Sequence, residues 1–491
     1  MPGGLIQLTT YGAQDLYLTG KPEISFFKSV YRRYTNYSTE MIEVAPTVEN
    51  KNLQMSDDII FTFDIGRDGD LVKDVFFTFT LPAIYSNHSN TSGRNFRWIE
   101  RIGEMIIKSV TLHIGGYQVD KLYGEWLHIW SELTLSDSQK DGYNKMIGNV
   151  VEIYDPESIP DISTYPTSTA EIPSIRSKKI FVPLKFFFNE SYSTALPLIA
   201  LQNIEKIRME FNLRPFEELY TIVDTDTNRK RPLSSVPNHN IGYYISHNSS
   251  TSITNYDINP NLEIEYIFLD RDERKRFALV EHQYLIHQNQ YREETITPLN
   301  SDLEYTFDLD ITNPVTQLIW AVRRDDHETA NMWHNYTNWP TSKDPLRSYS
   351  GSIDSNPYGN HSLSSQDISS YLEQNLVTET TLRLGDAMDR FSTKSWEMFN
   401  LVNNYQHCTR IPGDGIYVYS FELSNNNPKQ PSGSINLSRF DKIQLRVKLN
   451  KKCSQTINGS TSPYNYRLMV FARNINIYRI MGGMGAVEFS N

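Results

Sequence analysis

Short runs of alternating apolar and polar residues recur along the chain, separated by Asn, Ser, Thr, Pro and Gly. Asp58–Ile65 reads DIIFTFDI, and Leu71–Leu81 reads LVKDVFFTFTL. A period of two with β-branched and aromatic residues indicates half-buried β-strands. Similar runs are Ile106–Gly115, Ile180–Phe188, Ile204–Leu213, Leu262–Leu269, Gln317–Arg323, Ile416–Leu423, Ile443–Leu449 and Leu468–Ile480. The pattern predicts an all-β protein.

Two segments depart from this period. Leu122–Leu133 places its apolar residues three to four positions apart, which predicts an amphipathic helix. A second helical stretch is expected near Asp386–Asn403. The fold class is therefore all-β with a few short helices.

Three long polar insertions interrupt the strands, at Ser136–Ser177, Arg214–Asn261 and Asp325–Ser370. Loops of this length are uncommon inside compact domains and usually carry surface or recognition functions. We interpret them as outward-facing loops of β-sandwiches, and additional short strands within them are the alternative.

A weak internal repeat has an offset of 236 residues. Ile204–Phe211 resembles Phe440–Val447, and Ile180–Val182 resembles Ile416–Val418. Leu201 falls on Leu437 at the same offset. Two strand matches in one register indicate two copies of one β-domain, although chance matching of β-rich sequence is the alternative.

The cluster Arg271–Arg276 falls between the two expected copies. Asp272 and Glu273 interrupt its basic residues, so it predicts a salt-bridged connector. Lys and Arg number 47 against 58 Asp and Glu, a net charge of −11. Because phosphate binding needs a concentrated basic face, no direct genome binding is expected.

Composition limits the class of protein further. The chain has 491 residues with 30 Tyr, 23 Phe and 7 Trp, which favours packed sandwiches over disorder. Its two cysteines, Cys408 and Cys453, lie in no metal-binding pattern, and both are expected to be free thiols. The N-terminus has no signal-peptide pattern, and the longest apolar stretch, near Val75–Tyr85, is too short to span a bilayer.

The candidate chemical motifs are weak. Asp224–Asn228 begins like a calcium loop, but Arg229 occupies the position that needs Gly. Asp325–Glu328 with His334 has metal-ligand residue types, yet a solvated loop is the simpler interpretation. His407 and Cys408 are adjacent, which suits a partly buried pair better than a catalytic one. Neither a catalytic residue nor a cofactor-binding or metal-binding residue is assigned.

Nine Asn-x-Ser/Thr sequons occur, and glycosylation matters only if the chain meets a glycosyltransferase. The best candidates lie in the long insertions, at Asn248, Asn335 and Asn360.

Two β-domains of this size suit packed jelly rolls, an architecture that recurs in viral capsids. Motifs spread over the whole chain resemble the double jelly-roll major capsid proteins of nucleocytoplasmic large DNA viruses, above all those of algal viruses. The motifs include GGLIQL at 3–8, YGAQD at 11–15, YRRYTN at 31–36, GRDGDL at 66–71, FVPL at 181–184, LPLIAL at 196–201, YIFLD at 266–270 and QPSG at 430–433. The departures fall mainly in the three insertions.

The resemblance implies two consecutive eight-stranded jelly-roll sandwiches, at 26–270 and 282–491, joined by a connector at 271–281. It implies that residues 1–25 lie on the inner face of a capsid. It implies a homotrimeric, pseudo-hexameric capsomer that tiles an icosahedral shell with neighbouring capsomers, minor capsid proteins and a penton protein above an internal membrane. Synthesis in the host cytoplasm and assembly at a viral factory would follow.

Arg32 and Arg33 are expected to contact partner carboxylates or lipid phosphates, and a local salt bridge of Arg32 is the alternative. Two other classes stay open: a glycan-binding β-sandwich monomer and a glycan-degrading enzyme, which would need a carboxylate pair in a groove.

Overall fold

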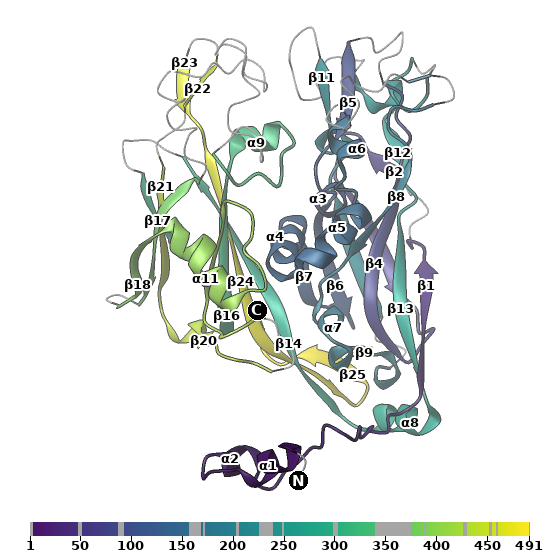
Figure 1. Cartoon of the computed structure of the whole chain (residues 1–491). Coiled ribbons are helices and arrows are strands. Elements are labelled where there is room, and N and C mark those ends of the chain that lie inside the picture. Colours follow the sequence, from purple (N-terminus) through teal and green to yellow (C-terminus); the bar gives the residue numbers. More distant parts are fainter. Residues whose placement is uncertain are drawn as a thin grey trace.

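The computed structural model describes residues 3–47, 52–86, 93–156, 168–169, 172–202, 206–224, 239–247, 250–297, 303–338, 375–385, 388–425, 430–450, 454–457 and 460–490. Two β-sandwiches stand side by side, and a thin N-terminal segment projects from one end (Figure 1). None of the described helices is long and apolar enough to cross a membrane.

The first sandwich packs a five-stranded sheet, whose main order is β1-β13-β4-β8, against a four-stranded sheet of order β3-β10-β6-β7. The strands of the first sheet are β1 (Tyr37–Val44), β13 (Asn261–Leu269), β4 (Leu71–Leu81) and β8 (Lys178–Pro183), with β9 (Leu196–Pro197) beside β4. Those of the second are β3 (Ile59–Ile65), β10 (Ile207–Leu213), β6 (Ile107–Ile114) and β7 (Tyr117–Tyr123).

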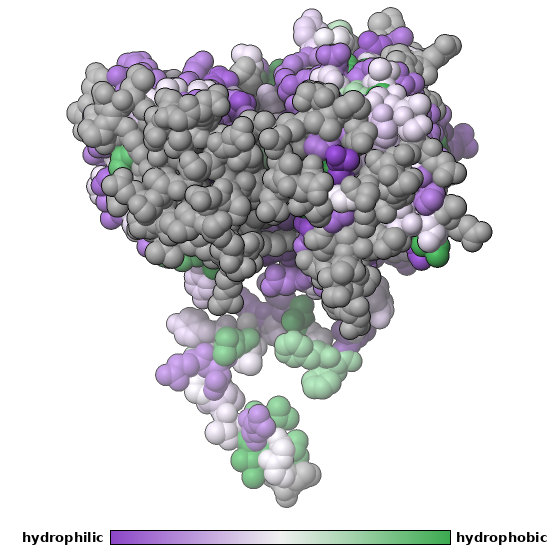
Figure 2. Space-filling view, turned by 90° about the horizontal axis from the view of Figure 1, so that it is seen from above, coloured by the Kyte–Doolittle hydropathy of each residue, from purple (hydrophilic) through white to green (hydrophobic). Residues whose placement is uncertain are grey.

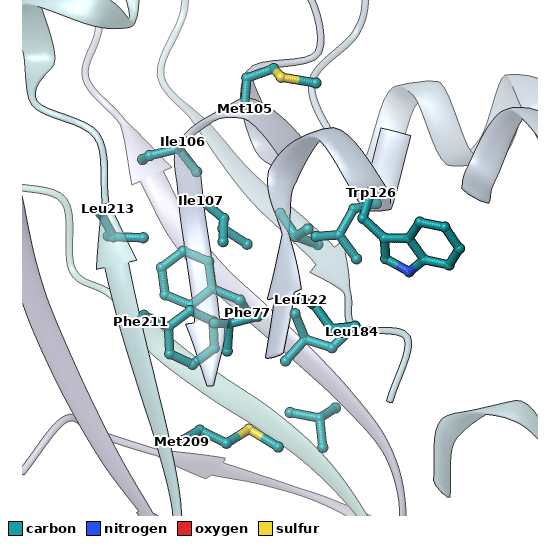
Figure 3. Packing of buried hydrophobic residues seen from close by; sticks show 14 of the residues in the cluster. Phe77, Met105, Ile106, Ile107, Leu122, Trp126, Leu184, Met209, Phe211 and Leu213 are labelled. Atoms are coloured by element: carbon teal, nitrogen blue, oxygen red, sulfur yellow. The ribbon is translucent and has the colours of Figure 1, made fainter. Parts of the chain in front are cut away.

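Apolar side chains from alternate positions fill this sandwich. The rings of Phe77 and Phe211 stack at 4.7 Å between the sheets, and Phe63 meets Phe211 edge-on at 5.4 Å. Figure 3 shows the two stacked rings beside Ile107 and Leu213. Aromatic pairs of this kind add to the stabilisation from burial, so the phenylalanine-rich strands specify the pairing of the two sheets.

The second sandwich repeats the arrangement, with orders β14-β24-β16-β19 and β15-β21-β17-β18. Its first sheet consists of β14 (His282–Ile296), β24 (Tyr466–Met481), β16 (Pro314–Arg324) and β19 (Ile416–Ser420), flanked by β20 (Ile435–Asn436) and β25 (Met484–Val487). Its second consists of β15 (Glu304–Asp308), β21 (Ile443–Leu449), β17 (Val377–Leu384) and β18 (Met388–Ser395). Trp320, Phe399 and Tyr417 form the aromatic centre of its core.

The strand orders show which segments are equivalent. β10 corresponds to β21, and its inward residues Ile207 and Ile443 are 236 apart, as the repeat predicts. β8 corresponds to β19, but there the predicted register is wrong. Val182 lies in the core of its sandwich, whereas Val418 faces the other sandwich and Tyr417 points inward. Successive residues of a strand point to opposite faces of the sheet, so a shift of one residue exchanges the faces. The match of Ile180–Val182 with Ile416–Val418 therefore aligned residues that point to opposite faces.

The Leu201–Leu437 match is also wrong. Leu437 begins the short helix η8 (Leu437–Arg439) directly after β20. The equivalent helix η3 (Leu198–Ala200) follows β9, so the counterpart of Leu437 is Leu198, three residues earlier.

The predicted helix is present as α4 (Gly124–Thr134), although Leu122 itself lies in β7. The second helical prediction is half wrong. β18 occupies Met388–Ser395, and helical structure begins directly after it at Trp396, continuing into the π-helix η7 (Met398–Val402) and α11 (Asn403–His407). The strand prediction at Ile180–Phe188 also extends too far, because α7 (Phe187–Glu190) follows β8. The Phe186 backbone N–H donates to Asn189 Oδ1, which favours the turn into that helix.

The long insertions contain regular structure. Ser136–Ser177 includes α5 (Asp137–Met146) and α6 (Val151–Tyr154), and Arg214–Asn261 includes β11 (Tyr220–Asp224) and β12 (Asn255–Asp257). β11 pairs with β5 (Arg94–Trp98), and β12 pairs with β2 (Asn52–Gln54). The alternative of additional strands is therefore confirmed for the second insertion. Asp325–Ser370 begins with α9 (Asp325–Thr329), and most of its remainder lies outside the described residues.

Several further elements of the two sandwiches are short. They are α3 (Ile102–Met105), η2 (Tyr192–Thr194), η4 (Phe216–Glu218), η6 (Ile241–Tyr243) and the hairpin of β22 (Ser454–Ile457) with β23 (Ser460–Pro463). Between the two sandwiches the chain forms α8 (Arg271–Leu279), whose N-terminus is capped by the Asp270 side chain. Arg274 of α8 pairs with Asp70 at 3.0 Å, in agreement with a salt-bridged connector.

Candidate functional site: the seam between the sandwiches and the N-terminal arm

In the sheet β14-β24-β16-β19, the central strands β24 and β16 are buried on both faces over most of their length. Ten of the eleven residues of β16 are buried without alternation. Leu318 and Trp320 belong to the core of the second sandwich, whereas Ile319 and Ala321 belong to the core cluster of the first. We call this contact of the sheet with α4, β7 and α7 the seam.

Aromatic residues form the centre of the seam. Trp126 and Trp130 of α4 stack at 5.3 Å, and Trp126 lies 5.4 Å from Phe471 of β24. Tyr123 at the end of β7 meets Tyr291 of β14 at 4.3 Å. Because each ring removes a large apolar area from water, this contact resembles a domain core more than a loose domain interface.

Buried charges connect the sandwiches on one side of the rings. Glu125 of α4 accepts from Arg214 at 2.7 Å and lies 3.4 Å from Arg323 of β16. Arg323 also pairs with Glu328 at 2.8 Å and donates to the Trp333 carbonyl. Burial opposes ionisation of Glu125, but Arg214 and Arg323 together hold its pKa below the ordinary value. Because its charges come from both sandwiches, this network favours one relative orientation of the two.

A second charged group lies at α7. Glu190 accepts from Arg473 of β24 at 2.8 Å and lies 2.8 Å from His287 of β14. Burial alone would raise its pKa, yet Arg473 and His287 lower it to about 2. Arg473 also stacks on Trp130 at 4.5 Å, with Glu422 3.9 Å from its guanidinium. Burial raises the pKa of Glu422 to about 7, so Glu190 is the principal counter-ion of Arg473.

A polar cavity of about 460 Å³ opens at the seam between α4, α5 and the segments around His334 and Arg410. Glu132 lies at its wall and pairs with Arg101, with Lys140 at 3.6 Å and with Arg410 at 3.2 Å. The cavity shows that part of the Ser136–Ser177 insertion, predicted to face outward, lies between the sandwiches. Three cations surround the Glu132 carboxylate, which suits a structural role better than acid–base chemistry.

The N-terminal arm, residues 3–36, is the second unusual surface. It contains α1 (Gly3–Thr9) and α2 (Asp15–Thr19), and all of its side chains are exposed. Figures 1 and 2 show it projecting from the body with hydrophobic and polar residues mixed. Its large exposed apolar residues are Leu5, Ile6, Leu8, Tyr11, Leu16, Tyr17, Leu18, Ile24, Phe26, Phe27, Val30, Tyr31 and Tyr34. So much exposed apolar surface marks an interaction segment.

Arg32 and Arg33 lie in this arm, both exposed. Neither forms an ion pair within the described part of the chain, so the alternative of a local salt bridge for Arg32 is wrong. Their role as contacts to another molecule stays a prediction.

Of the three glycosylation candidates, only Asn335 lies among the described residues. Asn335 is fully buried, and its Oδ1 accepts from the backbone N–H and the hydroxyl of Thr337. The folded chain has no room for a glycan there, so the assignment of Asn335 is not supported. Asn248 and Asn360 lie outside the described residues.

The other chemical motifs are also resolved in part. His327 is buried and contacts the Asn335 carbonyl at 3.1 Å, so the solvated loop expected at Asp325–Glu328 is wrong. Its buried environment was not predictable from residue types alone. Among the described residues, no group of three or more His, Cys, Asp or Glu side chains could hold a metal ion. Of the calcium-like segment only Asp224 is described.

Cys408 is a free thiol, and burial raises its pKa to about 12. Both His407 and Cys408 are half-buried, as expected for a structural pair. Cys453 lies outside the described residues.

Two jelly rolls in one chain, locked side by side by a buried seam, define a double jelly-roll capsid subunit. Comparison with known families agrees. The family described as "Major capsid protein N-terminus" matches residues 25–270, and "Large eukaryotic DNA virus major capsid protein" matches residues 273–486. The chain belongs to this family of major capsid proteins, which is a structural family and not an enzyme family.

Individual relatives support the assignment. The major capsid protein of Phaeocystis pouchetii virus is 32% identical, and that of Paramecium bursaria Chlorella virus 1 is 31% identical, each over the full length of both chains. A chain from the PBCV-1 virus capsid superposes with a TM-score of 0.65 and 25% identity, covering 95% of this chain and all of that one. The Faustovirus major capsid protein shares the fold, with a TM-score of 0.64 at 13% identity, covering 96% of this chain and 95% of that one. This chain is therefore a shell subunit that assembles with copies of itself.

Proposed function

We propose that the chain forms a homotrimer whose six jelly rolls make a pseudo-hexagonal capsomer, and that these capsomers tile the icosahedral shell of a large double-stranded DNA virus. The observation that carries this proposal is the repeated strand order in the two sandwiches. Three chains with two similar units each can occupy a six-fold lattice position with few kinds of interface.

We further propose a division into an inner-face segment at 1–25, jelly rolls at 26–270 and 282–491, and a connector at 271–281. The arm then lies beneath the shell, where its apolar residues with Arg32 and Arg33 contact minor capsid proteins or the internal membrane. Penton protein and neighbouring capsomers are the other partners. Synthesis in the host cytoplasm, assembly at the viral factory and glycans at Asn248 and Asn360 belong to the same proposal.

Sedimentation of the purified chain tests the central point. A stable species of three chains is the expected result. A monomer that binds sugars would contradict the proposal and favour the glycan-binding alternative. A particle image with this chain fitted into its capsomers would then test the positions of the arm and of the partners.

A further inference from the structure

The polar cavity at the seam contains one histidine from each sandwich. His128 belongs to α4 and is 5% exposed, and His334 belongs to the segment after α9. Their rings lie 6.3 Å apart and nearly perpendicular, and the ring of Tyr336 stacks on His128 at 5.9 Å. Glu100 lies 3.3 Å from His334. Because the charge of histidine ordinarily changes between about pH 5 and 8, two imidazoles that face each other here can make the seam sensitive to pH.

Cations from both sandwiches line the cavity with His128. Arg101 directly before α3 and Lys140 on α5 belong to the first sandwich, and Arg410 after α11 belongs to the second. Glu132 is shared by all three. The other charged or titratable described residues that line the cavity are Glu100, Tyr154, His334, Tyr336 and Asp414. A proton on His128 therefore adds a positive charge to a site that already holds three cations.

The carboxylate closest to His128 among the described residues is engaged elsewhere. Glu104 Oε2 lies 3.7 Å from His128 Nδ1, which is too far for a hydrogen bond. Glu104 accepts from Arg101 at 3.2 Å. It also accepts from the hydroxyls of Tyr143 at 2.6 Å and Ser131 at 3.0 Å. Within the described part of the chain, His128 Nδ1 is therefore a buried nitrogen without a hydrogen-bond partner.

The surroundings of His128 favour its neutral form. Burial is the largest cause that lowers its pKa, and Arg101, His334 and Lys140 lower the pKa further, to well below the ordinary 6.5. An imidazole that reaches water has a pKa of about 6.5. A seam that opens at His128 therefore takes up a proton, and the closed seam loses stability as the pH falls below about 6.5. For one proton, the equilibrium constant for opening rises about tenfold per pH unit.

The α7 side of the seam responds differently to acid. The pKa of Glu190 is about 2, so its ion pair with Arg473 persists where His128 takes up a proton. Burial raises the pKa of Asp120 and of Glu422 to about 7, so mild acid removes buried charge there. Mild acid therefore weakens the seam at the cavity and not at α7.

We propose that His128 and His334 form an acid-sensitive latch of the seam. When His128 is protonated, α4 and α5 separate from residues 332–338 and 410–416, while both sandwich cores and the α7 side of the seam stay packed. The latch is a property of the single chain and does not depend on the proposed trimer. A shell of such subunits loosens between the two jelly rolls of each subunit when its surroundings become mildly acidic.

Hydrogen exchange of the full-length chain, measured peptide by peptide with mass spectrometry, tests the latch. Exchange is compared at about pH 7.5 and about pH 5.5, after correction for the intrinsic pH dependence of amide exchange. Peptides from α4, 332–338 and 410–416 should exchange about tenfold faster at the lower pH, whereas peptides from β4 and β21 should not change. No acceleration at the seam, or an equal acceleration in β4 and β21, would overturn the latch.

His128→Gln removes the titrating ring and should abolish the difference between the two pH values. His113→Gln is the matched control, because His113 lies on β6 outside the cavity with its side chain 26% exposed. This control should keep the acid response of the wild type. A His128→Gln chain that also keeps that response would contradict the inference.

Lys140→Gln covers the case in which His128→Gln fails to fold. Lys140 is 32% exposed on α5, and its charge is one of those that oppose protonation of His128. Without this cation the closed seam accepts the proton more easily, so the acceleration by acid should become smaller. If the Lys140–Glu132 pair had only a structural role, its loss would speed exchange equally at both pH values. A wild-type acid response in Lys140→Gln would therefore count against the latch.

Discussion

The two sandwiches share a strand order, but their corresponding sheets are buried differently. In the first sandwich β4 has half-buried residues at Asp74, Phe76 and Thr80, while Phe77 lies in the core. In the second sandwich β16 is buried almost throughout, because the first sandwich covers its outer face. The difference teaches that position in the assembly, and not strand order, determines how apolar each face of a repeated sheet becomes.

The largest loss of stability is expected when the Trp126 side chain, which lies between the two sandwiches, is removed. Trp126→Ala removes a buried ring from the seam and should lower the free energy of unfolding by about 3–5 kcal/mol. Urea denaturation followed by fluorescence measures the change. A loss below about 1 kcal/mol would mean that the seam contributes little to the free energy of unfolding. The different burial of the two sheets would then have little effect on stability.

Acid should weaken the seam through Glu190. Its pKa is about 2 in the folded chain against an ordinary 4.5, so its charge stabilises the fold above pH 4.5, and this contribution is lost as the pH falls towards 2. The shift corresponds to about 3 kcal/mol. Unfolding free energies of the wild type and Glu190→Gln should therefore differ most near neutral pH and converge near pH 2. Curves that stay parallel would contradict this role.

The same amide substitution separates buried from exposed charge. Glu125→Gln weakens the ion pairs of this side chain with Arg214 and Arg323 inside the seam. The free energy of unfolding should fall by about 2–3 kcal/mol, less than for full loss of a buried pair because Arg323 keeps its pair with Glu328. Glu379→Gln breaks a pair with Lys448 whose side chains are 41% and 47% exposed. That change should cost under about 1 kcal/mol. Equal effects of Glu125→Gln and Glu379→Gln in thermal or urea unfolding would show that the buried ion pairs contribute no more to stability than the exposed one.

The smallest effect is expected on η7, which follows the edge strand β18 in the second sandwich as α4 follows β7 in the first. Leu401→Ala on η7 should change the stability of the monomeric chain by no more than about 0.5 kcal/mol, because this side chain is already partly in water. Unfolding of the dilute chain provides the measurement. A loss as large as that of Trp126→Ala would show that the two segments are not exposed differently.

Strand alternation predicted much of the fold from sequence. β4 and β21 begin and end at the predicted residues, because both carry an apolar face against one core. The stretch Asp386–Asn403 was predicted to be helical, but Met388–Ser395 within it forms β18, whose Phe391 packs into the core of the second sandwich. The structure of β18 is determined by the hairpin that it forms with the preceding strand β17, a pairing that the spacing of its apolar residues does not indicate.

Most contacts of the seam could not be predicted from the sequence. Arg323 and Arg324 end an apolar run, where charged residues normally mark the exit of a strand into water, yet both are almost fully buried. Their partners come from segments up to about 200 residues away, such as Glu125. Only the spacing of Trp126 and Trp130 in the predicted helix gave a signal, and that pattern could not distinguish a core from a seam.

The doubly covered sheet also constrains how this chain can change over generations. Ile319 and Phe471 face one sandwich while their strand neighbours Trp320 and Val470 face the other. A substitution on either face that shifts the sheet is felt by both cores, so acceptable replacements must come in compensating sets drawn from both halves. The two sandwiches are therefore expected to diverge together at the residues of this sheet. Exchange of one sandwich alone between related viruses should be rare.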